Sequence, residues 1–469
     1  MIDYDRWVIA DAVEPPGAAP TPAAPVTRPG RSRWVARSEG ALIVLGLLAN
    51  ALLLSHENRL DGALRFGALS ELLTTGQLPY LKYSMLGPAL AAPMWLLGKV
   101  FLGPLWWVLR FNTVVLGAGL LAVYLILKDR VDRGLLRKFF LLVVVASMFT
   151  NHLRFFYGEV FTAVLVTVGC VVLVVGPRLE GWAAVVAGVV NTPATIAGLA
   201  TLSIGQALRT RRIRHLLVVA VAGVLLLFVN WVQRHGPFDT GYADDHGVRS
   251  VMPYSGRPGL SNPLFFGLLA LLFSFGKGLL FFAPGLFLPV RRSADRAGDP
   301  EPMVAVYRAW LSFLVGVVLV YSMYWSWHGG YFWGPRYLLF ASVPASFALA
   351  VRLHRPAASV PGNLATILVL GLSVWVGIDG AVFGDQALFP VCMADNANLE
   401  VPLCYHTPEF SVLWYPFRAP SALSVGELVY LAYSVLVGVY LLVPLAVSTW
   451  RQVVTAAREG GWSVRAFRI

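Results

Sequence analysis

Long apolar stretches separated by short basic segments dominate the sequence. A helix needs about 20 apolar residues to cross the hydrocarbon core of a membrane, and basic residues concentrate in the loops that stay in the cytoplasm. If the basic segments all lie on the cytoplasmic side, an even number of crossings must separate any two of them. The basic segments are residues 31–37, 128–138, 209–215, 291–296, 352–355 and 451–468.

This condition predicts about 12 transmembrane helices with both chain ends in the cytoplasm. The predicted spans are residues 40–55, 105–127, 138–153, 157–176, 182–190, 192–206, 216–232, 262–290, 304–325, 337–351, 364–382 and 426–447.

Glycine and proline interrupt some of the apolar stretches. Residues 85–101 contain two of each, which predicts a juxtamembrane or re-entrant segment on the outer side. Residues 182–206 read as a hairpin of two short spans around Asn191 and Pro193. Residues 262–290 are too long for one span and are expected to break at residues 276–278. Irregular backbone at this depth requires protein or a water-filled cavity around it.

The composition supports a membrane protein. Of the 469 residues, 57% are hydrophobic and only 13% are charged, against about 25% charged residues in a typical soluble domain. This excludes a soluble enzyme, a nucleic-acid-binding protein and a disordered protein. The net charge of +12 is then the charge of the cytoplasmic loops. We predict an all-α, polytopic protein of the plasma membrane, with juxtamembrane helices on its outer face.

The chain divides into one membrane domain and two flanking segments. Residues 1–38, rich in proline and alanine, are predicted to be a disordered cytoplasmic leader. Residues 39–450 form the transmembrane domain, and residues 451–469 form a basic cytoplasmic tail. No internal repeat or separate soluble domain is evident.

Three cysteines have different predicted roles. Cys170 lies within a span and is expected to be a packing residue. Cys392 and Cys404 lie in one outer loop, where an oxidising compartment would permit a structural disulfide. The histidines are scattered without the spacing of a zinc site. We therefore predict no cofactor, although a divalent metal is left open.

An acidic residue follows the first span directly. Asp61 and Arg65 have the spacing of one helical turn, which is typical of an exposed ion pair. However, ionisable residues at the membrane edge are costly and are often functional. Asp61 is therefore also a candidate for catalysis.

Several motifs of residues 40–345 resemble the GT-C superfamily, whose members are polytopic glycosyltransferases that use polyprenyl-phosphate sugars. They include protein O-mannosyltransferases and aminoarabinose transferases. The resemblance rests on Asp61 after the first span, a G-x-L turn at residues 76–78, and GPALAAP at residues 87–93. It also rests on GKGLLFFAPGL at 276–286, FYGEVFTAVL at 156–165 and SWHGGYFWGPRYLLFASVP at 326–344. In contrast to many members, the chain has Gly62 beside Asp61 rather than a second acid, and it lacks a large C-terminal domain.

The resemblance implies a division of labour among charged residues. Asp61 would be the general base for the acceptor hydroxyl, and Glu159 a second catalytic or binding acid unless it only stabilises a helix N-terminus. Cations would stabilise the departing phosphate. The first candidate cation is Arg336, because its forked guanidinium group can bind two phosphate oxygens. The other candidates are Lys277, Arg65 and His328. Arg336 could alternatively be an interfacial anchor.

Four further residues are predicted to bind substrate: Glu57, Tyr83, Trp327 and Trp333. For the two tryptophans, the alternative is the aromatic belt that membrane proteins place at the interface.

We therefore predict a glycosyltransferase that passes a hexosyl or pentosyl group from a polyprenyl-phosphate donor to an acceptor hydroxyl, with inversion. Its partners would be the donor lipid, membrane lipid, and a glycan, lipid or protein acceptor, but no nucleic acid. The alternatives are a polytopic transporter, a flippase for lipid-linked sugars, a surface-polysaccharide polymerase or ligase, and a non-catalytic scaffold. The transferase requires Asp61 and Arg336 to meet beside a cavity open to the outer leaflet.

Overall fold

The computed structural model describes residues 33–458, except residues 244, 248, 250–251, 291–300, 331, 386–387, 393–402 and 420–421 and the side chains of residues 301 and 389. The predicted leader, apart from residues 33–38, and the end of the predicted tail therefore lie outside the described residues. Within them the protein is all-helical, with a single isolated bridge between Glu57 and Phe155. The all-α prediction is confirmed.

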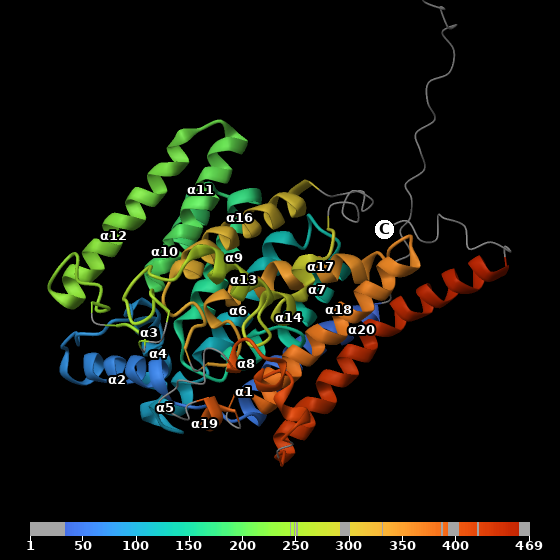
Figure 1. Cartoon of the computed structure of the whole chain (residues 1–469), viewed down its shortest axis with the longest axis horizontal. Helices are drawn as coiled ribbons and strands as arrows, with labels where there is room; N and C mark the ends of the chain where they lie inside the picture. The colour runs from blue at the N-terminus through green and yellow to red at the C-terminus, as the bar shows by residue number, and fades with distance from the viewer. Residues whose placement is uncertain are drawn as a thin grey trace, which may run out of the picture.

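Most helices follow one another with short connections, but a long segment, residues 235–263, separates the helices of the first half from those of the second (Figure 1). Those of the first half are α1 (Arg33–Leu53), α2 (Leu60–Thr75), α3 (Leu86–Leu90), α4 (Ala92–Val100), α5 (Pro104–Val108), α6 (Phe111–Leu127), α7 (Arg133–Val145), α8 (Phe149–His152), α9 (Gly158–Val175), α10 (Arg178–Asn191), η1 (Pro193–Thr195), α11 (Ile196–Thr210), η2 (Ile213–Leu216) and α12 (Leu217–Arg234). Those of the second half are α13 (Leu264–Phe273), α14 (Leu279–Phe282), η3 (Pro284–Phe287), α16 (Glu301–Met323), η4 (Arg336–Ala341), α17 (Ser342–His354), α18 (Val360–Ile378), η5 (Asp379–Phe383), α19 (Phe389–Cys392), η8 (Pro408–Phe410), η9 (Tyr415–Phe417) and α20 (Val425–Arg458).

Eight helices in the described part of the chain are long and apolar enough to cross a membrane. They are Arg33–Leu53, Pro104–Leu127, Gly158–Val175, Ile213–Arg234, Pro302–Met323, Arg336–His354, Val360–Phe383 and Val425–Arg458. The protein is thus a polytopic membrane protein. Other predicted spans correspond to shorter helices, among them α7, α10 and α11 with 13, 14 and 15 residues. The number of about 12 crossings stays a prediction.

The interruptions fall where glycine and proline predicted them. The segment 85–101 is divided into α3 and α4 at Ala91. The hairpin turns between Asn191, the last residue of α10, and Ile196, the first of α11, through the 3₁₀ turn η1. Residues 262–290 break after Phe273 and resume as a helix only at Leu279. Among the boundaries that differ from the prediction, α1 begins at Arg33 and α20 continues to Arg458.

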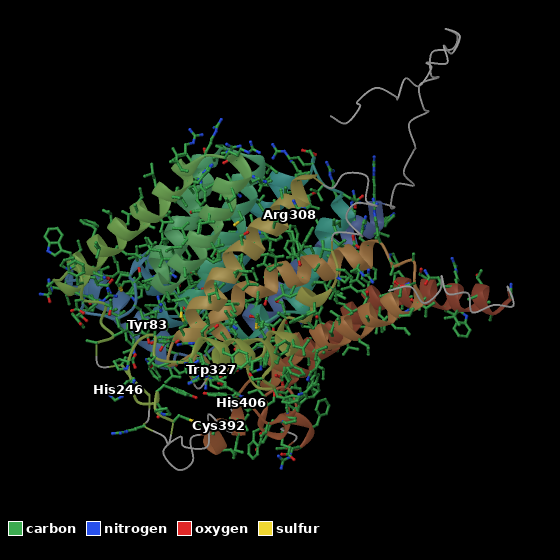
Figure 2. The ribbon with its side chains drawn as sticks, turned by 45° about the horizontal axis from the view of Figure 1, so that its top comes forward. Tyr83, His246, Arg308, Trp327, Cys392 and His406 are labelled. Atoms are coloured by element: carbon green, nitrogen blue, oxygen red, sulfur yellow. A yellow bond between two sulfur atoms is a disulfide. The ribbon has the colours of Figure 1, made fainter. Side chains whose placement is uncertain are left out.

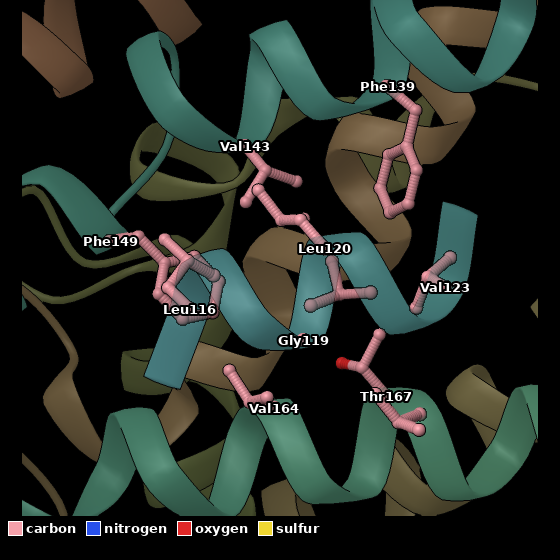
Figure 3. A pocket seen from close by; sticks show the side chains of 11 residues that line it. Leu116, Gly119, Leu120, Val123, Phe139, Val143, Phe149, Val164 and Thr167 are labelled. Carbon is pink, nitrogen blue, oxygen red and sulfur yellow. The ribbon is translucent and has the colours of Figure 1, made fainter. Parts of the chain in front are cut away.

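The helix α17 lies in the centre of the molecule and α12 at its edge (Figure 1). In the membrane-span candidate that contains α17 (Arg336–His354), 89% of the residues in the apolar stretch are buried inside the protein. In the candidate that contains α12 (Ile213–Arg234), only 11% are. α17 packs mainly against α7 and η3. Its Phe347 also contacts the aromatic rings of Phe139 on α7 and Trp310 on α16. A small apolar cavity of about 20 Å³ remains between α6, α7 and α9 (Figure 3). Its one hydroxyl lining group, Thr167, already donates to the Ala163 carbonyl, so the cavity is a packing gap.

Glycine permits the close approach of α18 to the end of α7. A methyl group on Gly377 would lie 1.8 Å from the Val145 carbonyl oxygen, whereas one on Gly371 of the same helix would meet nothing within 4 Å. We expect Gly377→Ala to destabilise the protein by roughly 1–3 kcal/mol, as overpacking does, and Gly371→Ala to be neutral or slightly stabilising. Thermal unfolding in detergent measures both. Equal effects of the two substitutions would contradict this packing.

Candidate functional site

Two oppositely charged residues from distant parts of the chain meet at the centre of the candidate site. Arg336 Nη1 lies 2.6 Å from Asp61 Oδ2, although 275 residues separate them. Asp61 occupies the first turn of α2, and Arg336 begins η4. The side chains are 16% and 7% exposed. The two residues meet as predicted, and the cavity open to the outer leaflet that was expected beside them stays a prediction.

Local backbone geometry directs Asp61 toward this partner. The residue before it, Leu60, has φ = 49°, in the left-handed region that costs a non-glycine residue about 1–2 kcal/mol. Such strain persists only where the surroundings determine the conformation, and it clusters at functional sites. The turn into α2 is therefore held in a conformation that leucine does not favour.

Tyr83 holds the other oxygen of the carboxylate. Its hydroxyl donates to Asp61 Oδ1 at 2.5 Å. The site thus contains Tyr83, but as a partner of Asp61 rather than as an open substrate contact.

Glu159 completes an acidic pair around the guanidinium. Its Oε1 lies 3.7 Å from Arg336 Nη1, and its side chain is 13% exposed. It stands in the first turn of α9, where the helix dipole favours a negative charge. Both predicted catalytic acids therefore face one cation.

The electrostatic balance keeps Asp61 ionised. Burial raises the pKa of Asp61, but the Arg336 guanidinium and the Tyr83 hydrogen bond together lower it more, so that it lies below its ordinary value. Asp61 is therefore an anion at neutral pH, as a general base requires, although the partnership with Arg336 weakens its basicity.

Aromatic rings surround Arg336. Its Cζ lies 3.6 Å from the ring centre of Phe332, 4.9 Å from that of Tyr337 and 5.9 Å from that of Tyr157. Cations over aromatic faces are stabilised by about 0.5–2 kcal/mol. These three rings were not predicted as site residues, although all lie within the sequence motifs that drew attention to Glu159 and Arg336.

Arg65 lies beside the pair but is not the ion-pair partner of Asp61 that the helical spacing suggested. Its Cζ sits 4.8 Å from the ring centre of Tyr83, and its Nη1 donates to the Ser84 carbonyl at 3.3 Å. The side chain is buried, and it packs against Gly158, where a methyl group would lie 2.7 Å from Nη2. Arg65 thus adds positive charge next to Asp61 and Glu159.

Lys277 lies apart from the acids and holds a loop, residues 329–336. Its Nζ donates to the carbonyls of Gly330, Phe332 and Gly334 at 3.2, 2.5 and 3.0 Å. Three glycines of this loop, including Gly329, have positive φ, which permits such a tight path. Because this loop carries Phe332 and Arg336, Lys277 acts on the site by positioning it.

We expect Lys277→Met to destabilise the protein by at least about 2 kcal/mol, because three buried carbonyls would lose their donor. Unfolding by heat or denaturant measures this change. The matched control is Lys99→Met, since Lys99 is exposed and lies 4.6 Å from the Trp95 ring centre. If the Lys277→Met variant is as stable as the wild type but binds phosphate less tightly, Lys277 contacts the phosphate as the sequence predicts.

His328 and Trp327 also help to hold the 329–336 loop in place. His328 Nδ1 accepts from the Gly330 N–H at 3.0 Å, and its ring stacks on Tyr405 at 4.5 Å. Burial, reinforced by nearby Lys277, holds the pKa of His328 well below its ordinary value, so the ring is neutral. Trp327 packs edge-on against Tyr405 and is 7% exposed. A neutral, buried histidine corrects the prediction of a phosphate-binding cation.

Trp333 is a packing residue in this structure. It is 1% exposed, and its indole N–H donates to Asp379 Oδ2 at 2.7 Å. No face of the ring is open to a substrate. The sequence pattern could not separate a buried tryptophan from an interfacial one.

Glu57 joins a second charged cluster rather than the Asp61 site. Its carboxylate lies 3.3 Å from Arg59 Nε and 3.5 Å from Arg154 Nη2. Arg59 also pairs with Asp385 at 2.5 Å. This cluster fastens the segment before α2 to the loop after η5, and only its Glu57 member was predicted as a site residue.

Cys392 and Cys404 form the predicted disulfide. The bonded pair adjoins Tyr405, whose carbonyl accepts from the Gly276 N–H at 3.0 Å and whose hydroxyl reaches the Gly330 carbonyl at 3.3 Å. The disulfide, Tyr405 and Lys277 thus hold the 329–336 loop from one side. Figure 2 labels Trp327, His406 and Cys392 at this end of the molecule.

The C-terminal end of α12 supports Tyr83. Gln233 Nε2 donates to the carbonyls of Leu81 and Tyr83 at 2.8 and 2.6 Å, and Arg234 Nε donates to that of Leu81 at 2.9 Å. The intervening Lys82 pairs with Asp245 at 2.9 Å. Lys82 is therefore a further cation near the site, and it is not among the residues that the sequence predicted there.

In the described residues, no group of three or more His, Cys, Asp or Glu side chains could hold a metal ion.

No protein-family model and no curated protein sequence matches this chain. Among solved structures, the chain is similar to the crystal structure of ArnT from Cupriavidus metallidurans in the apo state. The TM-score is 0.48 and the identity 14%, over 87% of this chain and 77% of that one. Because both values are low, the match does not establish a family.

Proposed function

We propose that the protein is a polytopic membrane glycosyltransferase of the GT-C type. It takes a sugar from a polyprenyl-phosphate donor and transfers it to an acceptor hydroxyl at the extracytoplasmic face of the plasma membrane. Because the lipid donor cannot leave the bilayer, the reacting residues have to lie at the level of the membrane. The observation that carries the proposal is the meeting of Asp61 and Arg336 across 275 residues of sequence.

Unused hydrogen-bonding capacity supports a phosphate at this place. Arg336 Nε is buried and has no hydrogen-bond partner in the described part of the chain, and the same is true of Arg65 Nε. Arg336 Nη2 reaches only the Tyr337 hydroxyl, at 3.5 Å. Buried donors without partners are costly, and a phosphate oxygen would satisfy them in the bidentate manner that guanidinium groups favour.

The proposed reaction follows from these positions. A donor phosphate competes with the two carboxylates for Arg336, which releases Asp61 to accept the proton of the acceptor hydroxyl. The acceptor oxygen forms a bond to the anomeric carbon while the bond from that carbon to the phosphate oxygen breaks. The electron pair leaves with the polyprenyl phosphate, whose growing charge Arg336 stabilises in the transition state. Attack opposite the leaving group inverts the anomeric centre.

The test is transfer by purified protein reconstituted with acceptor membranes. Polyprenyl-phosphate sugars carrying a labelled sugar should yield labelled product and free polyprenyl phosphate, and nucleotide sugars should yield neither. In sealed vesicles, labelled donor that crosses between leaflets without loss of its sugar would contradict the proposal and would favour a flippase.

A further inference from the structure

A cluster of exposed arginines lies at the opposite end of α9 from the candidate site. Glu159 stands at the first turn of α9, whereas Arg178 follows its last turn and opens α10. Four more arginines lie in the last turn of α11 and in the connection from α11 to α12, and all five are exposed. They are Arg178, Arg209, Arg211, Arg212 and Arg214. We call these five residues the arginine patch.

The two turns lie side by side around one histidine. The ring of His215 lies 5.8 Å from that of Trp182 on α10. Arg178 from one turn and Arg212 and Arg214 from the other are close enough to act on His215 electrostatically. The described ion pairs include none of the five arginines, and one acid, Glu180, is exposed beside them.

Apolar side chains project from the same turns. Leu179 is 81% exposed, Leu208 75% and Ile213 82%. In a membrane protein such residues enter the acyl region while neighbouring arginines stay at the headgroups. His215, by contrast, is buried and its Nε2 has no hydrogen-bond partner in the described residues. An unpartnered polar atom thus lies close to the arginine patch, whose concentrated positive charge a phosphate-bearing ligand would neutralise.

Another basic turn at this face has acids among its cations, since Asp129 and Asp132 stand between Lys128, Arg130 and Arg133. Asn112 of α6 donates to the Tyr157 carbonyl, and Gly119 packs on Val164, so α6 runs parallel to α9 and ends at the same face. In the turn after α6, Arg133 pairs with Asp129 at 2.8 Å, and Arg137 of α7 pairs with Glu39 at 2.6 Å. The two turns differ in their partners although both are basic.

We propose that the arginine patch is a binding site for the headgroups of anionic phospholipids in the leaflet at this face. Guanidinium groups bind phosphate oxygens bidentately, and basic residues between transmembrane helices bind anionic headgroups. The exposed Leu179, Leu208 and Ile213 would lie among the acyl chains of the same lipids. The proposal does not depend on the proposed transferase activity.

The test compares two triple substitutions in the full-length protein. The patch variant is Arg211→Gln, Arg212→Gln and Arg214→Gln, and the control is Lys128→Gln, Arg130→Gln and Arg133→Gln, which removes the same charge at the same face. Each protein is reconstituted with an equal mixture of phosphatidylglycerol and phosphatidylcholine and extracted into mild detergent. Mass spectrometry of the retained lipid measures the enrichment of phosphatidylglycerol.

We expect the wild type and the control to enrich phosphatidylglycerol and the patch variant to lose at least fivefold of that enrichment, since one cation near a membrane surface contributes about fivefold. Lysine at the same three positions should restore most of it, and size-exclusion chromatography verifies folding. The proposal would be overturned if the patch variant and the control lost the same phosphatidylglycerol enrichment, or if the wild type did not enrich this lipid. The patch would then be assigned to a soluble partner instead.

Discussion

Asp61→Asn is expected to lower sugar transfer by roughly 10²–10⁴-fold, the contribution of a positioned general base. Asparagine keeps the shape of the side chain and can still accept the Tyr83 hydrogen bond, but it cannot take up a proton at neutral pH. Initial rates with a labelled polyprenyl-phosphate sugar measure the loss, and donor affinity is expected to change little by comparison.

The matched control for this substitution is Glu71→Gln on the same helix, because Glu71 is exposed on α2. It should transfer at the wild-type rate. Wild-type turnover by the Asp61→Asn variant would exclude Asp61 as the base and leave Glu159 as the remaining acid near Arg336.

Arg336→Ala is expected to reduce the transfer rate by roughly 10²–10³-fold, as the loss of one donor to a developing anion does. Donor affinity should fall as well, because the guanidinium group contacts the phosphate before the bond breaks. Arg336→Lys should recover part of the rate, since it restores the charge without the fork. Arg257→Ala, at an exposed arginine on a loop, is the control.

A pH profile separates this role from a structural one. Arg336 contributes to the low pKa of Asp61, so in the wild type Asp61 loses its charge only below the ordinary pKa of an aspartic acid side chain. Without Arg336, burial raises that pKa, and the acid limb of the rate profile should move to higher pH. If the two residues serve only as an ion pair, the double variant Asp61→Asn, Arg336→Met should regain the activity that either single change removes.

The sequence predicted the central pair because charge at a membrane edge is unusual. Asp61 and Arg336 stood out against apolar neighbours, and their order along the chain agreed with known motifs. The breaks at Asn191 and Gly276 were predictable for a similar reason, since glycine and proline act on the local backbone. In each case the physical cause lies within a few residues of the effect.

The roles of Lys277, His328 and Trp333 could not be predicted in this way. Lys277 is held by backbone carbonyls, which every sequence has, so no residue type marks its partners. Trp333 depends on Asp379 from another helix. Tyr157 reaches Arg336 only through the tertiary fold. The sequence pattern indicates which polar side chains are costly to bury. The groups that offset this free-energy cost lie in distant parts of the chain and are not marked by the pattern.

The short helix α10 has a consequence for the depth of the site. Its 14 residues rise about 21 Å, whereas the hydrocarbon layer is about 30 Å thick. At its last residue, Asn191 accepts from the Gly87 N–H at 3.1 Å and donates to the Gly158 carbonyl, one residue before Glu159, at 2.9 Å. If Arg178 lies at one headgroup layer and α10 runs along the membrane normal, these contacts lie about 9 Å short of the other layer. We then expect the acids and cations to lie below the membrane surface, so that a reacting molecule would have to enter the membrane to reach them.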